Sequence, residues 1–206
     1  SGKDRVKILF IRPPRHYWPI LNESDNFLLP LGYPSLAAWV RREVPEADIE
    51  ILDCCPMKIG WQSLRREVQM RNPDIVCVGE KVCYIHEAFR VMRLVKEVLP
   101  ECVTITGGHL ASHLPRWCLD QCSAIDYVIR YEGEVPLSSL VEHLVGRKKL
   151  CDVPNLVCTV DGEHYETVIG PNIEDLDELP VPAYDLANIQ MYAPFGLLWP
   201  RAATIQ

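Results

Sequence analysis

Five short apolar runs, each rich in valine or isoleucine, recur along the chain at roughly even intervals. They are Val6–Ile11, Asp48–Leu52, Ile75–Gly79, Cys102–Thr106 and Tyr127–Ile129. Apart from Asp48–Leu52, the runs do not alternate cleanly between apolar and polar residues, as expected of strands that are covered on both faces. The pattern therefore predicts five buried β-strands.

Segments with helical spacing lie between and after these runs. They cover Pro34–Glu43, Trp61–Arg71, His86–Leu99, Leu114–Gln121 and Glu134–Val145. The clearest is His86–Leu99, whose apolar residues form one stripe along a helix. Alternating strands and helices predict an α/β fold, with a doubly wound, five-stranded parallel sheet and helices on both of its faces. We expect the flavodoxin-like strand order 2-1-3-4-5.

The pattern changes after residue 150. Asn155–Val160 and His164–Ile169 flank Asp161-Gly162, which predicts a β-hairpin. The acidic, proline-rich stretch Asn172–Tyr184 follows and is typical of an extended linker. We therefore expect a first domain at residues 3–150, and a hairpin with a linker at residues 151–206.

Composition narrows the class of protein. Of the 206 residues, 48% are hydrophobic and 24% are charged, as in ordinary soluble proteins. The net charge of −7 argues against nucleic acid as a partner, and no apolar run approaches the ~20 residues of a membrane span. Nine cysteines without a secretory leader favour a reducing, cytoplasmic compartment. Ser1-Gly2 is typical of an expression-tag remnant and plays no part in the fold prediction.

The loops after the predicted strands carry the candidate chemistry, because ligands of such sheets bind at the carboxyl ends of the strands. The first strand runs into RPPRHYWP and a long connection, which is either a surface excursion or a pocket wall. Leu29–Pro34 leads into a helix whose N-terminus offers free amide donors. Glu80–Ile85 is either an ordinary loop or one face of a site for a flat, apolar cofactor.

Two adjacent glycines, Gly107 and Gly108, end the fourth run. A turn that needs positive φ explains one glycine, whereas two indicate a ligand lying against bare backbone. His109 follows them, and a lone histidine in a loop is more often hydrogen-bonded than bound to a metal. After the fifth run, Glu134 is placed to cap a helix, and Glu132 is better placed to accept hydrogen bonds from a ligand.

These pieces occur in a characteristic order. A Pro-Pro pair after the first strand precedes PLGYPSLAAWV, PDIVCVG, TITGGH, DYVIRYEGE, LSSLVEHL and DLDELPVPAYDL. The ordered set resembles the N-terminal cobalamin-binding domain of cobalamin-dependent radical S-adenosylmethionine enzymes of the methyltransferase and cyclase type. The resemblance covers residues 6–190, nearly the whole chain.

The resemblance implies a cobalamin over the carboxyl ends of the strands, with its nucleotide tail beside the glycines of the fourth strand. It implies no catalytic residue and no metal ligand from this chain. The implied cofactor-binding residues are Pro13, Pro14, Arg15, Leu31, Gly32, Tyr33, Glu80, Lys81, Val82, Cys83, Tyr84, Thr106, Gly107, Gly108, His109, Tyr131, Glu132 and Gly133.

One departure from the wider cobalamin-binding superfamily concerns the lower ligand of cobalt. Methionine synthases and mutases carry DxHxxG after the first strand, whereas this chain has RPPRHYW, so His16 is a poor candidate for that ligand. The resemblance then implies base-off cobalamin, with the benzimidazole displaced and no protein histidine on cobalt. Val82 and Tyr84 are the residues expected nearest the lower face of the corrin.

In the resembling enzymes a CxxxCxxC motif in a following barrel binds a [4Fe-4S] cluster, which acts with S-adenosylmethionine. This chain lacks that spacing, and Cys118 and Cys122 fit two half-buried thiols on one helix face. We expect an excised domain that binds cobalamin but catalyses nothing alone. Its partner would be the barrel of the same parent chain, which would carry out methyl transfer or a related radical reaction.

Two other interpretations remain open from the residues. The same fold can bind another flat cofactor such as flavin, although RPPR replaces the Ser/Thr-rich phosphate loop of a flavodoxin. A degenerate domain that binds no corrinoid, and only contacts a barrel or a partner protein, fits the apolar loops as well. A receiver domain does not fit, because no acidic cluster ends the first strand.

Overall fold

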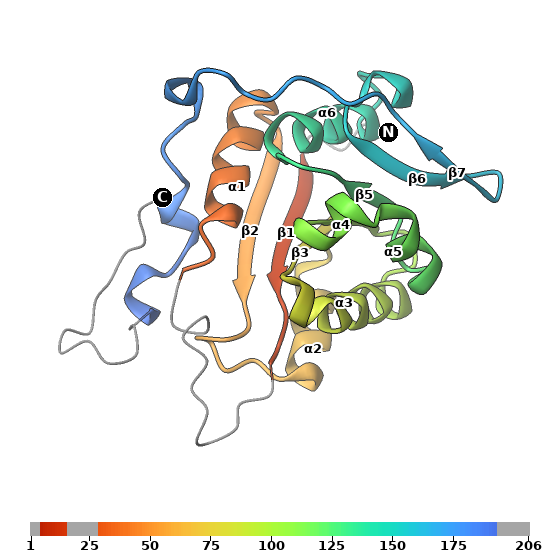
Figure 1. Ribbon diagram of the computed structural model, residues 1–206. Coiled ribbons are helices and arrows are strands. Elements are labelled where there is room, and N and C mark those ends of the chain that lie inside the picture. Colours follow the sequence, from red (N-terminus) through yellow and green to blue (C-terminus); the bar gives the residue numbers. More distant parts are fainter. Residues whose placement is uncertain (1–4, 16–28, 193–206) are drawn as a thin grey trace.

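The computed structural model describes residues 5–15 and 29–192 of the chain (Figure 1). Its centre is one seven-stranded sheet in the order β2-β1-β3-β4-β5-β6-β7. Strands β1 to β5 pair in parallel, and β6 and β7 are antiparallel additions. The strands are β1 Val6–Arg12, β2 Ala47–Asp53, β3 Ile75–Gly79, β4 Val103–Gly107, β5 Tyr127–Ile129, β6 Leu156–Val160 and β7 Glu163–Glu166.

The predicted hairpin forms, but it continues the main sheet. β6 pairs with β5, where Ile129 lies opposite Leu156, and β7 pairs with β6. The predicted sheet therefore needs correction: it has seven strands of mixed orientation, of which the first five follow the expected order. The physical reason is that β5 has an edge with free backbone groups, which a neighbouring hairpin can pair.

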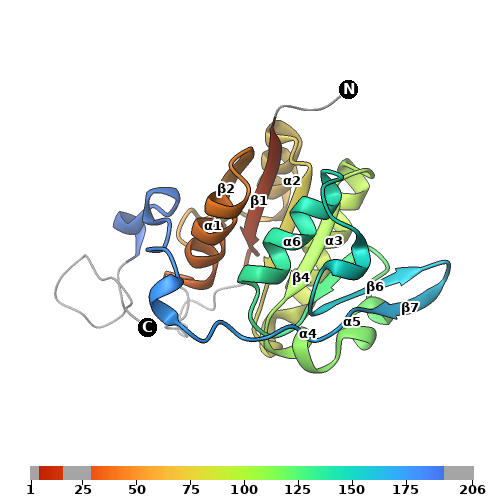
Figure 2. The same ribbon diagram turned by 90° about the horizontal axis from the view of Figure 1, so that it is seen from above.

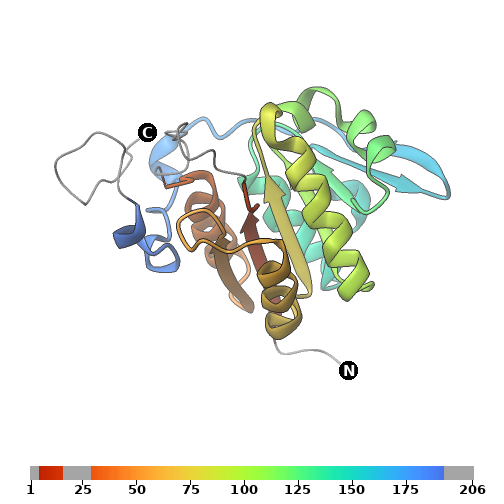
Figure 3. The ribbon, with the colours of Figure 1, turned by 90° about the horizontal axis from the view of Figure 1, so that it is seen from below.

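Helices cover both faces of the sheet, as predicted (Figures 2 and 3). One face carries α1 and α6, and the opposite face carries α2, α3, α4 and α5. The helices are α1 Gly32–Glu43, α2 Trp61–Arg71, α3 Ile85–Val98, α4 His109–His113, α5 Pro115–Gln121 and α6 Glu134–Leu144. Short 3-10 helices occur at η2 Val82–Tyr84, η3 Leu150–Asp152, η4 Leu176–Glu178, η5 Tyr184–Leu186 and η6 Ile189–Met191.

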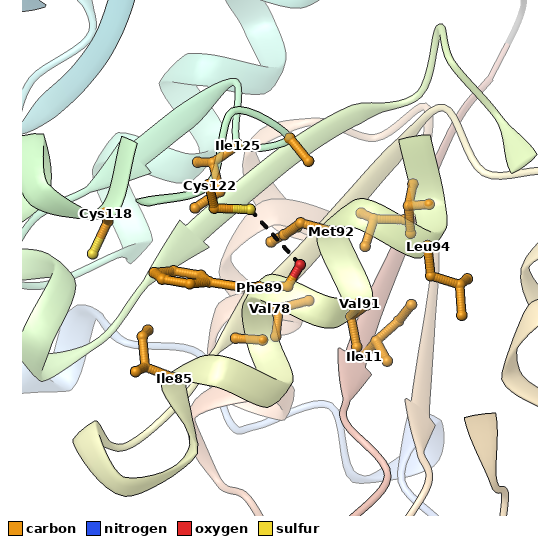
Figure 4. Packing of buried hydrophobic residues seen from close by; sticks show 14 of the residues in the cluster. Ile11, Val78, Ile85, Phe89, Val91, Met92, Leu94, Cys118, Cys122 and Ile125 are labelled. Carbon is orange, nitrogen blue, oxygen red and sulfur yellow. Dashed lines mark hydrogen bonds between the residues drawn. The ribbon is translucent and has the colours of Figure 1, made fainter. Parts of the chain in front are cut away.

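Each face of the sheet has its own apolar core. Figure 4 shows part of the core under α3, where Phe89 and Met92 lie among side chains such as Val78. Cys118 and Cys122 belong to this core and are 0% and 1% exposed, so they are fully buried rather than half-buried. The thiol of Cys122 donates a hydrogen bond to the carbonyl of Phe89 (3.7 Å), and burial raises the pKa of Cys118 to about 11.

The cysteines give no sign of disulfide or metal chemistry. All nine are free thiols, and only Cys83 and Cys151 are exposed. Within residues 5–15 and 29–192, no group of three or more histidine, cysteine, aspartate or glutamate side chains is arranged to hold a metal ion. In the same part of the chain no helix combines the length and the apolar character needed to cross a bilayer.

Tyr33 fills the place where β1 and β3 separate. The two strands pair only as far as Phe10 and Cys77, so their last residues do not bond to each other. The Tyr33 hydroxyl lies between them, 3.1 Å from the Ile11 carbonyl and 2.9 Å from the Gly79 carbonyl, and accepts the Gly79 N–H (3.1 Å). This hydroxyl takes the place of the missing sheet hydrogen bonds. Burial and the negative charge of the nearby Glu80 raise the pKa of Tyr33 well above its ordinary value, so the hydroxyl stays protonated.

We predict that Tyr33→Phe lowers the free energy of unfolding by about 1–3 kcal/mol, because it leaves buried backbone groups of β1 and β3 without their partner. Urea denaturation followed by circular dichroism measures the change. Tyr165→Phe, which removes the same atom from a partly exposed side chain on β7, is the matched control and should cost less than about 0.5 kcal/mol. Equal losses in both variants would contradict the bridging role.

Candidate functional site

A cavity of about 720 Å³ opens at the carboxyl ends of the strands, on the face that α1 and α6 cover. Its walls are mainly apolar. Its apolar lining comes from the strands through Phe10, Cys77, Val78, Ile105 and Ile129, and from the flanking segment and helices through Leu29, Pro30, Leu31, Leu36 and Leu137. This size lies within the roughly 300–1,000 Å³ range of small-molecule pockets. Its position at the carboxyl ends of the strands is where doubly wound sheets bind their ligands.

Most residues that the sequence implied as cofactor-binding line this cavity. They are Arg15, Leu31, Gly32, Tyr33, Glu80, Lys81, Thr106, Gly107, Gly108, His109, Tyr131, Glu132 and Gly133. Five others do not line it: Pro13, Pro14, Val82, Cys83 and Tyr84. These five lie on the two loops beside the mouth, after β1 and β3. His16 lies outside the described residues.

The apolar floor of the cavity is formed by residues that the sequence did not mark as cofactor-binding. Phe10, Cys77 and Ile105 lie two residues before Arg12, Gly79 and Gly107, on the same face of three neighbouring strands. Their residue types and positions predict only ordinary strand core. Because side chains on one face of a strand recur every second residue, counting back from the glycines would have found them.

Two glycines on neighbouring strands leave part of this floor without side chains. Gly79 and Gly107 are register partners of β3 and β4. A Cβ at Gly107 would be 3.5 Å from the Ile129 carbonyl oxygen, and a Cβ at Gly79 would meet nothing closer than 3.9 Å. These are ordinary contacts, so folding does not exclude side chains here. The bare main chain is available to a ligand.

Gly108 is a glycine for a different reason. Its φ of 97° and ψ of −175° fall in a region that only glycine adopts readily. A Cβ there would also lie 3.0 Å from the backbone oxygen of Glu80. The two adjacent glycines thus have separate causes: Gly108 makes the turn, and Gly107 leaves the cavity floor open.

Two buried ion pairs form the wall near the end of β1. Arg15 Nη2 donates to Glu80 Oε2 (2.7 Å), and its guanidinium lies 3.7 Å from the centre of the Tyr84 ring. Arg12 Nη1 donates to Asp53 Oδ2 (3.1 Å). Burial raises the pKa of Glu80, and the positive charges of Arg15 and Arg12 oppose that rise. The wall therefore carries paired charges rather than a strongly charged surface.

The opposite rim comes from the segment between β5 and α6. Tyr131 is 48% exposed and has a φ of 61°, which is uncommon for a side chain of its size. Its N–H donates to Ser112 Oγ (2.7 Å). Gly133 allows close packing, since a Cβ there would lie 2.9 Å from Leu36 Cδ2. Glu132 accepts a hydrogen bond from Ile173 N–H (3.2 Å), so that carboxylate is engaged within the chain.

Comparison with known families identifies this kind of domain. Residues 17–141 match the family described as the B12 binding domain. The chain belongs to the B12-binding domain family. That match begins after β1 and covers α1 through most of α6, including strands β2 to β5.

Curated relatives are two to three times longer than this chain. An uncharacterized methyltransferase of Pyrococcus horikoshii is 27% identical over 197 residues, 94% of this chain and 42% of the relative. The hopanoid C-3 methylase of Methylococcus capsulatus is 32% identical over 85% of this chain and 33% of its own length. An anaerobic magnesium-protoporphyrin IX monomethyl ester cyclase of Rubrivivax gelatinosus is 26% identical over 91% of this chain and 34% of its own length.

Solved structures share the fold of this B12-binding domain. The cobalamin-dependent S-adenosylmethionine radical enzyme OxsB, with aqua-cobalamin and S-adenosylmethionine bound, aligns with a TM-score of 0.72 at 19% identity. The alignment covers 88% of this chain and 24% of OxsB. The methyltransferase TsrM of Kitasatospora setae, with cobalamin and a [4Fe-4S] cluster, aligns at 0.66 and 15% identity over 86% of this chain and 31% of TsrM.

The contrast between the two glycines is testable through stability. We predict that Gly108→Ala lowers the free energy of unfolding by about 1–3 kcal/mol, because alanine is strained at that φ and meets the Glu80 backbone. Gly107→Ala should change it by less than about 1 kcal/mol, since it meets only ordinary contacts. Urea denaturation of both variants gives the comparison, and a larger loss for Gly107→Ala would refute the assignment.

Proposed function

We propose that this chain binds cobalamin in the cavity between the sheet and the helices α1 and α6. The observation that carries the proposal is the bare floor at Gly79 and Gly107, in a domain of the B12-binding family. A Cβ at either position would make only ordinary van der Waals contacts, so the fold itself does not require a glycine there. The nucleotide tail would lie along this floor, and the corrin would cover the strand ends.

The residues around the cavity fit such a cofactor. A flat aromatic base and its sugar need apolar walls, which Phe10, Ile105 and Leu137 provide. The peripheral amides of the corrin need polar partners at the mouth, where His109 and Tyr131 are available. The paired charges of the wall agree with a cofactor that carries little net charge.

We further propose that the cofactor is bound base-off, with no histidine of this chain on cobalt. The loop after β3 would face the lower side of the corrin. Val82, which is 56% exposed, is free to contact a corrin, whereas the Tyr84 ring is already covered by the Arg15 guanidinium. Tyr84 and Arg15 would then support the loop rather than touch cobalt.

When bound, cobalamin supplies methyl-transfer or related radical chemistry. The residues of this chain bind it, orient it and shield its tail from water. The names of the longer relatives, a methyltransferase, a methylase and a cyclase, support a role as the cofactor domain of such an enzyme. A radical S-adenosylmethionine barrel with its [4Fe-4S] cluster would then lie in the parent chain, beyond residues 151–206, in a cytoplasmic protein. The boundary between domains at residue 150 stays a prediction.

The decisive test is retention of hydroxocobalamin by the purified chain. We expect hydroxocobalamin to elute together with the protein in gel filtration. The red fraction should have a visible spectrum shifted from that of the free cofactor. Gly107→Val should abolish retention, because its side chain would fill the space for the tail, while the chain stays folded by circular dichroism. Gly60→Val is the matched control and should retain cobalamin, since Gly60 has open space around it and lies away from the cavity.

Two other ligands separate the alternatives. Cobinamide, which lacks the nucleotide tail, should be retained at least about tenfold more weakly than cobalamin if the tail occupies the cavity. Retention of flavin without cobalamin would favour a flavodoxin-like module. Retention of neither by the folded chain would favour a degenerate interaction domain, and either result would refute the proposal.

A footprint on the two exposed cysteines tests the place of the corrin. Cys83 lies on the loop after β3, and Cys151 lies in η3, outside the cavity lining. We predict that iodoacetamide modifies both thiols in the free chain. Bound cobalamin should slow modification of Cys83 about fivefold or more, as a covered group reacts only when the cofactor leaves. Mass spectrometry of the peptides measures both rates, and equal rates at Cys83 with and without cobalamin would contradict this placement.

A further inference from the structure

The segment after the hairpin, residues 170–192, crosses the whole α1 and α6 side of the molecule. It runs from the β6–β7 edge past α6 to the outer side of α1 (Figures 1 and 2). Along this path Ile173 N–H donates to Glu132 at the cavity rim (3.2 Å). Ala183 N–H donates to the Pro34 carbonyl at the start of α1 (2.9 Å). The expected linker is therefore attached to the elements that form the cavity.

Its last attachment is buried at the end of β2. Tyr192 is 3% exposed, and its hydroxyl donates to Asp53 Oδ2 (2.7 Å). The same oxygen accepts from Arg12 Nη1 (3.1 Å), and Asp53 Oδ1 accepts the N–H of Cys55 (3.0 Å). Asp53 and Arg12 are 3% and 5% exposed. A charged group in such a place depends on each of its donors, because water cannot replace them.

This cluster reaches the cavity in two ways. Arg12, which shares Asp53 with Tyr192, lines the cavity wall. The Tyr192 ring packs in a small apolar cluster with Leu29 and Leu31, and both of these leucines also line the cavity. Tyr192 itself does not line it. Any effect of Tyr192 on a ligand therefore acts through Asp53 and Arg12 or through the two leucines.

We propose that Tyr192 is a positioning residue for the cofactor cavity, and that residues 183–192 are part of the cofactor-binding unit rather than a passive linker. The hydroxyl holds Asp53 and so orients Arg12 in the wall. The ring holds Leu29 and Leu31 in place. This inference rests on the proposed binding of cobalamin. It predicts that docking of the segment and binding of the cofactor strengthen each other, since such coupling is reciprocal.

The first test compares binding constants. Tyr192→Phe should weaken binding of hydroxocobalamin about tenfold, measured by absorbance titration at a temperature where circular dichroism shows the variant folded. One control, Tyr165→Phe, should bind as the unaltered chain does, because it removes a hydroxyl that does not line the cavity.

The second test needs no variant. In the unaltered chain, saturating hydroxocobalamin should slow hydrogen exchange at the backbone amides of residues 183–192 by a similar factor of about ten, relative to amides of the β6–β7 hairpin. Tyr192 with a purely structural role would lower the stability of the free chain and leave both the binding constant and this exchange unchanged, which would overturn the inference. Failure of the unaltered chain to bind cobalamin would instead overturn the proposed function, and this inference with it.

Discussion

The separation of β1 from β3 is the constraint on which the site depends. The strands pair up to Phe10 and Cys77 and then diverge, because α1 and α3 leave them toward opposite faces of the sheet. Divergence leaves backbone groups of both strands without sheet partners. The Tyr33 hydroxyl bonds to both strands and so bridges the opening between them. The crevice is thus a result of strand order, made stable by one side chain from the helix that borders it.

The floor of the crevice depends on register as much as on composition. A single glycine between larger neighbours would leave only a small depression in the cavity floor. Gly79 and Gly107 are partners on adjacent strands, so their bare main chains form one continuous strip. Behind this strip Phe10, Cys77 and Ile105 complete an apolar surface. A flat ligand can contact such a surface over its whole face, which gives favourable burial without a need for charged partners.

The charged side chains around the crevice act mainly by fixing the shape of its wall. Arg12, the last residue of β1, is paired with Asp53, Arg15 in the loop after β1 is paired with Glu80, and both pairs are buried. Pairs of this kind contribute little net stability, but they are strongly directional, because a misplaced partner leaves a charge buried alone. Here they connect the ends of β1, β2 and β3 with Tyr192, more than a hundred residues away in the chain. The segment after the hairpin is thus attached to the carboxyl ends of these strands.

Local patterns determined much of this protein from its sequence alone. Apolar runs, helical stripes and the Asp161-Gly162 turn predicted the strands, the helices on both faces and the hairpin, because these depend on neighbours within a few residues. Most of the glycines and loop residues named from the sequence line the cavity at the carboxyl ends of the strands. Only the tertiary structure showed that the hairpin extends the sheet and that Gly107, unlike Gly108, is not needed for the backbone. It alone showed that Phe10 lines a cavity and that Tyr192 meets Asp53. The reason is that register and contacts between distant segments arise only when the whole chain packs. The type of a single residue in the sequence does not specify which distant residue it will contact.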